Sequence, residues 1–490
     1  MLRPRLPRSR AARVLVTVLA VTPVGGCAHR PPAASVTAAP PGSALATTYR
    51  ADADRLIDAA LADSAAYRRL AQLTDRFGSR FSGTPALDSA IDWILAEMKR
   101  DGLDDVRGEP VMVPHWSRGA ESLELVAPRA QRLHVIGLGG SVGTPPDGIT
   151  AEVLVVRSFD ELAARASEAR GRIVLFDAPF PTDRAPFLGY RDVVRYRTAG
   201  AVAAARVGAV ASLVRSVTPH SLSTPHTGGM RYDSTVARIP SAAVTVEDAE
   251  LLRRMRERGE RVVVTLKMGA RTLPDAPSRN VVAEIVGRER PDEVVVLGGH
   301  IDSWDVGQGA MDDGGGSVAA WEAVRLIKRL GLRPRRTVRV VLWTNEENGL
   351  RGGIGYRAAH AAELDRHVLA MESDAGTFSP TGFGVGGTDS TLAVARRIAP
   401  LLARIGASTM TAGEDEADIS PLVASGVPGM GLQVDPSRYF WYHHTDADTM
   451  DKLDPRELAR CVATMAVMAY VVADMPERLP RGAATATSSR

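Results

Sequence analysis

The chain has 490 residues, of which 45% are hydrophobic, 5% aromatic and 24% charged, so it is long and apolar enough for two or more globular domains. The formal net charge is +3, but residues 1–26 hold five arginines and no acidic residue. This leaves −2 on the rest of the chain and predicts no nucleic-acid partner. Only two cysteines occur, Cys27 and Cys461, which excludes a disulfide framework.

Residues 1–27 have the layout of an export signal. An arginine-rich start is followed by the apolar run Val14–Ala20, and Val24–Cys27 then reads Val-Gly-Gly-Cys. These four residues resemble a bacterial lipobox, in which the cysteine is lipidated; the alternative is a plain signal peptide with a chance cysteine. We therefore expect an exported bacterial envelope lipoprotein, periplasmic or at the outer membrane, with a lipid anchor at Cys27. Residues 28–47 are rich in Pro, Ala, Ser and Thr and predict a disordered linker.

Folded sequence is expected from about residue 48. Residues 48–125 contain two stretches with helical spacing of apolar residues, and the polar loop Phe77–Thr84 between them is expected near a substrate groove. In residues 126–275 short β-rich runs alternate with helix patterns, and no catalytic cluster occurs; His220 and His226 are interpreted as lone loop histidines. This texture predicts a β-rich domain inserted into another domain.

Strand and helix patterns alternate strongly in residues 276–475. The strand runs are almost continuously apolar, which is typical of a mostly parallel sheet buried on both faces by helices, the α/β class. The apolar run Val462–Ala473 is too short to span a bilayer and predicts a buried helix. Residues 476–490 are polar and predict a disordered tail. The expected strands are Val281–Val286, Val294–Leu297, Val338–Trp343 and Val368–Met371, and the expected helices are Ser317–Leu330, Leu392–Ile405 and Pro455–Asp474.

Five polar clusters follow these strands or precede the last helix. Each alone has an ordinary interpretation, such as a solvated turn or the cap of the next helix. Together they fall at the same end of one predicted sheet, where α/β proteins carry their chemistry. Imidazole and carboxylate groups are zinc ligands, and a two-metal site needs a bridging carboxylate. The clusters are His300/Asp302, Asp312/Asp313, Glu346/Glu347, Asp374 and the loop from His443 to Thr449.

Read in order, the segments GGHIDS, GAMDDGGG, TNEENGLRG, ESDAG and YHHTDADT resemble the family-28 zinc metallopeptidases, and within them the plasma glutamate carboxypeptidase (carboxypeptidase Q) branch. The segments GRIVLFDAP and IPSAAVTVEDAELLRRM resemble a protease-associated domain. The resemblance implies a mostly parallel mixed sheet in a three-layer, zinc-aminopeptidase-like fold. The peptidase domain would be discontinuous, residues 48–125 and 276–475, with a protease-associated insert at 126–275.

The resemblance also implies roles for the site residues. His300 and Asp374 would hold one zinc ion, Glu347 and His444 a second, and Asp312 would bridge the two. Glu346 would be the general base that takes a proton from the attacking water, and Asp302 would orient the ring of His300. The Asp312–Asp313 peptide bond is cis in this family.

Two positions leave alternatives. His443 competes with His444, but the family spacing of His, three residues and then an acid followed by Thr fits His444, Asp448 and Thr449. Asp418 is either a substrate-site residue or an ordinary loop acid. Three aromatic residues are either an apolar wall of the site or core: Trp304, Phe440 and Trp441.

The expected activity is that of a zinc-dependent exopeptidase of aminopeptidase or dipeptidase type, acting on short peptides. Alternatives are a carboxypeptidase-type activity, a glutaminyl-cyclase-type activity, or a non-catalytic receptor-like protein on the same scaffold. The last should have lost ligands or the base, and here all six positions are filled. Relatives are often dimers, so we expect a homodimer.

Overall fold

The computed structural model describes residues 42–414 and 416–484. The predictions that concern the export signal and Cys27 therefore lie outside the described residues. The first helix, α1 (Gly42–Ala62), begins within the segment predicted as linker. Within the described part of the chain, no helix is both long and apolar enough to cross a membrane.

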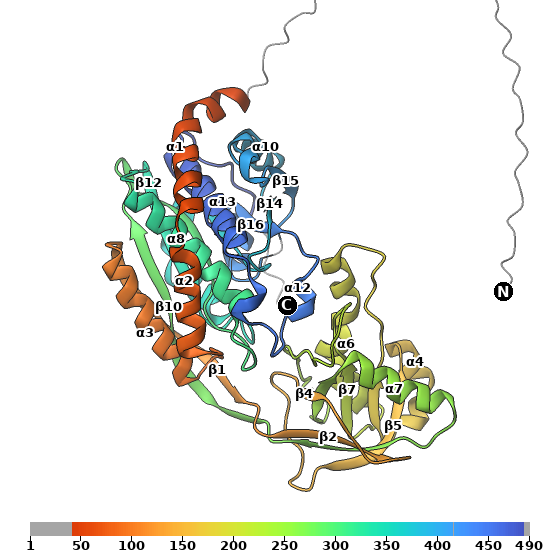
Figure 1. The fold of residues 1–490 in the computed structure, drawn as a ribbon. Helices are drawn as coiled ribbons and strands as arrows, with labels where there is room; N and C mark the ends of the chain where they lie inside the picture. The colour runs from red at the N-terminus through yellow and green to blue at the C-terminus, as the bar shows by residue number, and fades with distance from the viewer. Residues whose placement is uncertain (1–41, 415, 485–490) are drawn as a thin grey trace, which may run out of the picture. The chain divides into compact units, whose positions relative to one another are not determined.

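The first sheet has eight strands in the order β1-β10-β12-β11-β13-β16-β14-β15 (Figure 1). Its centre is parallel, because β11 pairs in parallel with β12 and β13, and β13 with β16. Towards the edges, β1 pairs antiparallel with β10, β10 with β12, and β14 with β16, whereas β14 and the edge strand β15 are parallel. The strands are β1 (Asp104–Ser117), β10 (Arg271–Ile285), β11 (Arg290–His300), β12 (Arg336–Trp343), β13 (His367–Glu372), β14 (Pro380–Val385), β15 (Thr409–Ala412) and β16 (Gly429–Val434).

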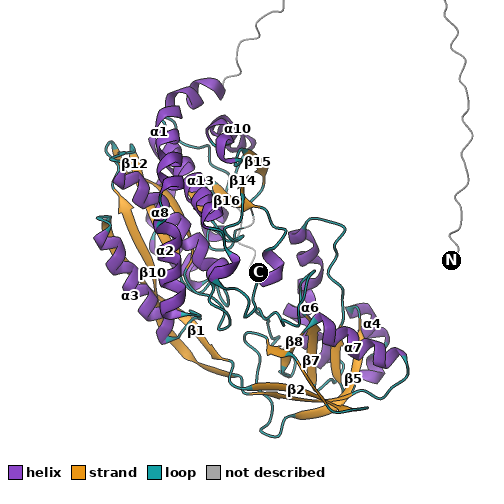
Figure 2. Cartoon of the chain, in the orientation of Figure 1, coloured by secondary structure: helices purple, strands orange, loops and turns teal. Residues whose placement is uncertain are grey.

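Helices cover both faces of this sheet, and Figure 2 shows α2, α8 and α13 on one of them. On β11, Val295 and Leu297 belong to the core shared with α1, α8 and α13, whereas Val294 and Val296 belong to a second core shared with α9 and α11. This alternation buries successive side chains on opposite faces, as expected for a central strand. The predicted three-layer α/β fold is thus confirmed. The helices are α2 (Ala65–Phe77), α3 (Pro85–Arg100), α8 (Gly315–Arg329), α9 (Arg351–Ala359), α10 (Asp389–Ile398), α11 (Ser420–Ala424), α12 (Tyr439–Tyr442) and α13 (Pro455–Asp474).

Two predicted segments differ from the structure. The helix expected over Leu392–Ile405 ends at Ile398 and continues as short 3₁₀ turns, because Pro400 lacks the N–H that the next helical turn needs. Residues 476–484, expected within a disordered tail, pack on the domain that contains the first sheet: Leu479 is buried, and Arg481 donates to the carbonyls of Leu364 and His367 at 2.7 and 2.9 Å.

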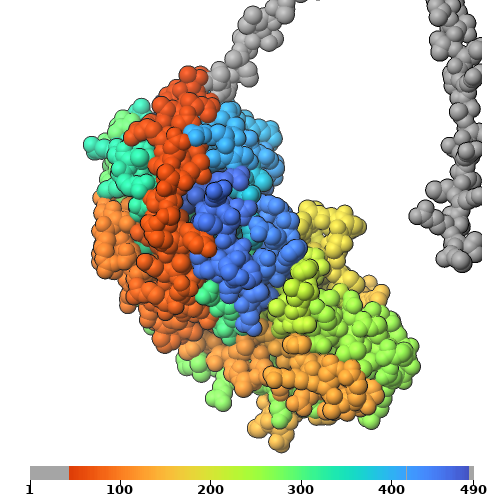
Figure 3. Space-filling view, viewed as in Figure 1, coloured from red at the N-terminus to blue at the C-terminus, as the bar shows by residue number. Residues whose placement is uncertain are grey.

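The segment of chain that connects β1 to β10 forms a second eight-stranded sheet. Its strand order is β3-β2-β9-β5-β6-β7-β8-β4. It has its own core, which includes Leu125, Leu175 and Leu252, and it lies beside the blue C-terminal segment (Figure 3). We refer to residues 121–268 as the insert. Its elements are β2 (Glu121–Ala127), β3 (Gln131–Leu133), β4 (Val135–Gly137), β5 (Ile149–Val156), α4 (Phe159–Ala164), α5 (Ala166–Ala169), β6 (Ile173–Phe176), α6 (Pro186–Arg206), β7 (Ala211–Arg215), β8 (Ser241–Val244), α7 (Val246–Glu257) and β9 (Val263–Met268).

A buried histidine, His367, stands at the start of β13. Burial, and then the charge of Arg339 and the neighbouring His360, lower the pKa of His367 to about 4, although the Glu363 carbonyl and carboxylate oppose this. The His367 Nδ1–H donates to the Glu363 carbonyl at 3.0 Å, and Nε2 lies 3.1 Å from the Tyr356 hydroxyl. Tyr356 in turn accepts from Arg339 at 2.8 Å. The folded chain therefore holds this imidazole in its neutral form.

We expect wild-type protein to lose stability relative to His367→Gln as the pH falls from about 6.5 to about 4. In that window the unfolded histidine binds a proton that the folded one does not, so stability falls with falling pH. The difference should be on the order of 2–3 kcal/mol, and urea unfolding of both proteins at several pH values measures it. A pH-independent difference would contradict this account.

Candidate metal centre

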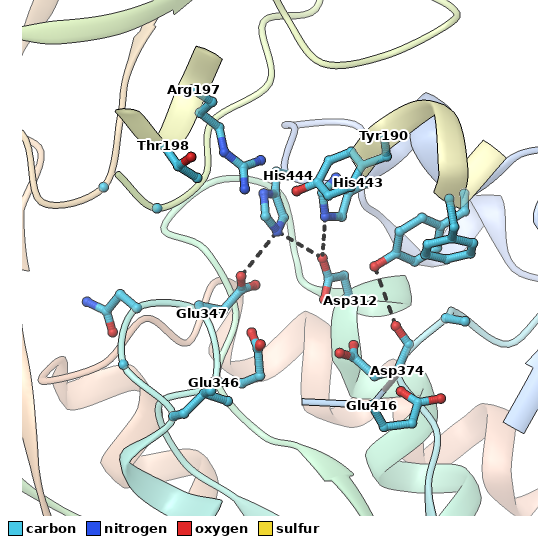
Figure 4. A pocket seen from close by; sticks show the side chains of 18 of the residues that line it. Tyr190, Arg197, Thr198, Asp312, Glu346, Glu347, Asp374, Glu416, His443 and His444 are labelled. Atoms are coloured by element: carbon cyan, nitrogen blue, oxygen red, sulfur yellow. Dashed lines mark hydrogen bonds and ion pairs between the residues drawn. The ribbon is translucent and has the colours of Figure 1, made fainter. Parts of the chain in front are cut away.

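The carboxyl ends of three parallel strands meet at one edge of the first sheet. β11 ends at His300, β12 leads into Glu346 and Glu347, and β13 leads into Asp374. The loop after α12 brings His444 to the same edge. A cavity of about 1090 Å³ opens there, and its wall is formed by the metal-centre residues together with residues of the insert (Figure 4).

Asp312 lies between two pairs of potential ligands. The Nε2 atom of His300 is 3.2 Å from Asp312 Oδ1 and 3.2 Å from Asp374 Oδ1. The Nε2 atom of His444 is 3.3 Å from Asp312 Oδ2 and 3.2 Å from Glu347 Oε2. One carboxylate thus turns one oxygen to each pair, which is the arrangement of a carboxylate that bridges two metal ions.

The donor set fits zinc. Two atoms that bind the same zinc ion tetrahedrally at about 2.0–2.1 Å lie about 3.3 Å apart, close to the separations found here. Asp312 Oδ2 and Glu347 Oε1 are also buried without a hydrogen-bond partner. Buried carboxylate oxygens without a partner are costly, and a bound cation removes that cost.

The electrostatics of the cluster also favour bound cations. Burial, and then the neighbouring carboxylates, raise the pKa values of Glu346 and Glu347 well above the usual range. Burial would also raise the pKa of Asp312, but the close imidazoles of His300 and His444 hold it well below its ordinary value. So many carboxyl groups cannot all be ionised in a buried site unless positive charge is supplied.

Asp302 holds the loop that carries Glu346. His300 Nδ1 lies 2.9 Å from the backbone carbonyl of Asp302 and 3.7 Å from its carboxylate. The carboxylate accepts instead from the backbone N–H groups of Glu346 at 3.0 Å and Glu347 at 3.4 Å. The ring orientation expected from the Asp302 side chain therefore comes from its backbone, and the side chain fixes the neighbouring strand end.

Two further supports were not identified from the sequence. The carboxylate of Asp448 accepts from the backbone N–H groups of Ala310, Met311 and Asp312 at 3.1, 2.7 and 3.1 Å. Arg80, fully buried, donates to three carbonyls of the loop between His300 and Asp312. The predicted groove loop Phe77–Thr84 thus supports the site from beneath, and none of its residues lines the cavity.

Replacing Asp448 by asparagine should lower metal affinity about 10–100-fold, as other losses of a ligand-supporting residue do. An asparagine amide turns an N–H towards donors that need an acceptor, so the backbone that carries Asp312 loses its anchor. Competition with a chromophoric chelator measures the affinity. Asp451→Asn, whose side chain is exposed in the same loop, is the matched control. Equal affinities of the two variants would contradict the role of Asp448.

Several other candidates lie close to the centre. The His443 ring stacks on His444 at 3.5 Å between ring centroids, and its Nε2 is 3.7 Å from Asp312 Oδ2, farther than that of His444. Asp418 is fully buried with both oxygens unpartnered, but it does not line the cavity. His226, interpreted above as a loop residue, is buried, and its ring nitrogens also lack partners.

The three aromatic candidates separate in the structure. Phe440 lines the cavity and stacks on Tyr190 of the insert at 4.8 Å. Trp304 is core, stacked on Phe81, although its ring also lies 5.5 Å from that of His444. Trp441 is partly exposed and stacks on His220. Only Phe440 therefore contributes to an apolar wall of the cavity.

Comparisons with known proteins agree with this geometry. Residues 280–469 match the model of Peptidase family M28. Carboxypeptidase Q of Homo sapiens is 49% identical over 420 residues, 86% of this chain and 88% of that protein. The crystal structure of a Peptidase M28 precursor from Shewanella amazonensis is 36% identical, covers 88% of this chain and 98% of its own, and has a TM-score of 0.85. A zinc aminopeptidase from Bacillus subtilis shares the fold at 20% identity and a TM-score of 0.64, over 85% of this chain and 97% of its own.

The fold and the paired ligand sets define a metallopeptidase, a hydrolase with zinc as its metal. The chain belongs to peptidase family M28, and its site residues fit two zinc ions.

The predicted localisation as a bacterial envelope lipoprotein is wrong. The relatives that match most of the chain at 49% identity are carboxypeptidases Q of human, mouse and Xenopus, which point away from a bacterial lipoprotein. The prediction depended on the four residues Val24–Cys27. A motif that short carries little information, because small and apolar residues also end plain signal sequences.

Proposed function

We propose that the chain is an exopeptidase that hydrolyses short peptides, with Glu346 as the general base. The observation that carries the proposal is Asp312, with one oxygen towards each of two histidine–carboxylate pairs at the floor of a large cavity. Because Glu346 lines that cavity and has none of these close contacts to the histidines, its carboxylate is available for proton transfer.

His300, Asp374 and Asp312 would hold one zinc ion, and His444, Glu347 and Asp312 the other. When bound, the two ions polarise the scissile carbonyl and make water acidic enough to attack at neutral pH. Glu346 accepts the proton of the attacking water and then donates it to the leaving amine. Asp302 positions Glu346 by holding its backbone N–H.

The cavity supports short peptides as substrates. Its volume of about 1090 Å³ is at the upper end for small-molecule sites and is too small for a folded protein. Glu416 lines the wall beside Asp374, so this end of the cavity is acidic and suits the ammonium group of a free peptide N-terminus. An aminopeptidase or dipeptidase has such a recognition site next to the scissile bond.

We propose that the insert corresponds to a protease-associated domain and that the chain forms a homodimer. Exposed apolar side chains, among them Leu188 and Leu222, would find cover in a dimer. Light scattering of the purified protein decides the oligomeric state.

Hydrolysis of blocked and unblocked peptides tests the exopeptidase proposal. We expect free dipeptides to be cleaved, and peptides that carry both an N-acetyl and a C-terminal amide group to be resistant. A chelator should abolish the activity and zinc should restore it. Cleavage of doubly blocked peptides as fast as free ones would show an endopeptidase, and would contradict the proposal.

A further inference from the structure

A cation without a counter-ion is buried in the wall of the cavity. Arg197 lies on α6 of the insert, and only 8% of it is exposed. Among the residues that the structure describes, no carboxylate lies within ion-pair distance of its guanidinium. Its Nη1 donates to the Thr227 carbonyl at a long 3.4 Å, and its Nε–H has no partner. A buried charge with so few contacts is unfavourable unless a ligand completes them.

The surroundings hold this guanidinium in place. Its Cζ lies 5.5 Å from the centroid of the Tyr190 ring. On the other side is Gly228, where a Cβ atom would stand 2.4 Å from the guanidinium, so only glycine leaves room for it. Both Arg197 and Tyr190 line the cavity. Arg197 is thus pre-positioned at the cavity and is not a solvated surface arginine.

Arg197 and the acidic residue Glu416 line opposite sides of the cavity. Figure 4 shows Arg197 above His444, whereas Glu416 lies beside Asp374 on the other side of Asp312. A peptide that lies across the metal centre with its ammonium group at the acidic end directs the far side of its scissile bond towards Arg197. The C-terminal carboxylate of the leaving group would then be the counter-ion of Arg197.

We propose that Arg197 binds the free terminal carboxylate of the peptide substrate and thereby selects peptides that end close to the scissile bond. A guanidinium presents two parallel N–H groups to a carboxylate, and the pairing is strong where water is excluded. This inference rests on the proposed exopeptidase function. It gives the insert a part in substrate selection, since Arg197 lies on a helix of the insert and the zinc ligands lie outside it.

The test compares dipeptides with their C-terminal amides, for wild type and Arg197→Met. We expect wild type to prefer the free carboxylate by about 100–1,000-fold in kcat/KM, as for other buried charge pairs that lose one partner. Arg197→Met should lose this preference because its kcat/KM for free dipeptides falls. Its kcat/KM for the amides should stay within a few-fold of wild type. Arg197→Lys keeps the charge without the planar fork and should fall between them. Arg195→Met, on the exposed side of α6, is the matched control.

Binding is measured separately by calorimetry in a Glu346→Gln background, where the ligand is not consumed. We expect the free dipeptide to bind tighter than its amide, and the additional Arg197→Met change to remove that difference. Equal handling of dipeptides and amides by wild type in both assays would overturn the inference but leave the exopeptidase function standing. Tight selective binding without any hydrolysis would support the inference and contradict the proposed function. If Arg197→Met does not fold, an undiminished carboxylate preference in Arg197→Lys, with dipeptide affinity unchanged, would likewise overturn it.

Discussion

Replacing Glu346 by glutamine is expected to lower kcat for dipeptides by about 10³–10⁴-fold and to leave the zinc content unchanged. Glutamine has nearly the same shape but cannot accept the proton of the attacking water, and a general base contributes about 10²–10⁴-fold. The side chain lines the cavity and lies outside the paired contacts around Asp312, so metal binding should survive. Steady-state kinetics and elemental analysis of the same samples measure both effects.

Glu124→Gln is a suitable control, because Glu124 is an exposed glutamate on β2 of the insert. It should match wild type in both measurements. If Glu346→Gln instead loses zinc in parallel with activity, the residue is a ligand and a different group acts as the base.

Replacing Asp312 by alanine should remove both zinc ions and most of the stability that zinc confers. Asp312 is the one residue among the described ligands with an oxygen near each histidine, so its loss opens both sites together. A ligand present at about 1,000 times its Kd stabilises the folded state by about 4 kcal/mol. We expect wild type to gain several degrees in Tm when zinc is added to chelated protein, and Asp312→Ala to gain almost nothing.

Asp446→Ala changes an exposed aspartate two residues from His444 and serves as the control. It should bind zinc as wild type does. A full zinc complement in Asp312→Ala would mean that Asp312 does not bridge, and that the two pairs bind their ions independently.

Much of the centre follows from sequence because its residues sit directly at strand ends. His300 ends β11, and Glu346, Glu347 and Asp374 follow β12 and β13 within a few residues. Neighbouring parallel strands end at the same edge of a sheet, so these residues come together without any further contact having to be predicted. The apolar strands themselves indicated the three-layer fold.

The supports of the centre could not be predicted in this way. Asp448 and Arg80 act on backbone atoms more than a hundred residues away in the sequence, and no local pattern marks such contacts. For Asp302 the sequence indicated a role, but not that its carboxylate binds the Glu346 backbone while its carbonyl contacts the His300 ring.

Arg197 could not be found from the sequence either. It lies in the insert, which shows no catalytic cluster, and only the packing of α6 against α12 brings it to the cavity. A lone arginine in an amphipathic helix normally faces solvent. Its burial without a counter-ion is a property of the folded chain alone.

The most direct measurement of the central claim is the zinc content of the purified chain, determined together with dipeptide hydrolysis during zinc titration of the chelated protein. Two zinc ions per chain, with hydrolysis absent in the chelated protein and restored as the sites fill, is the predicted result. Hydrolysis that persists at the same rate in protein free of zinc would contradict the account.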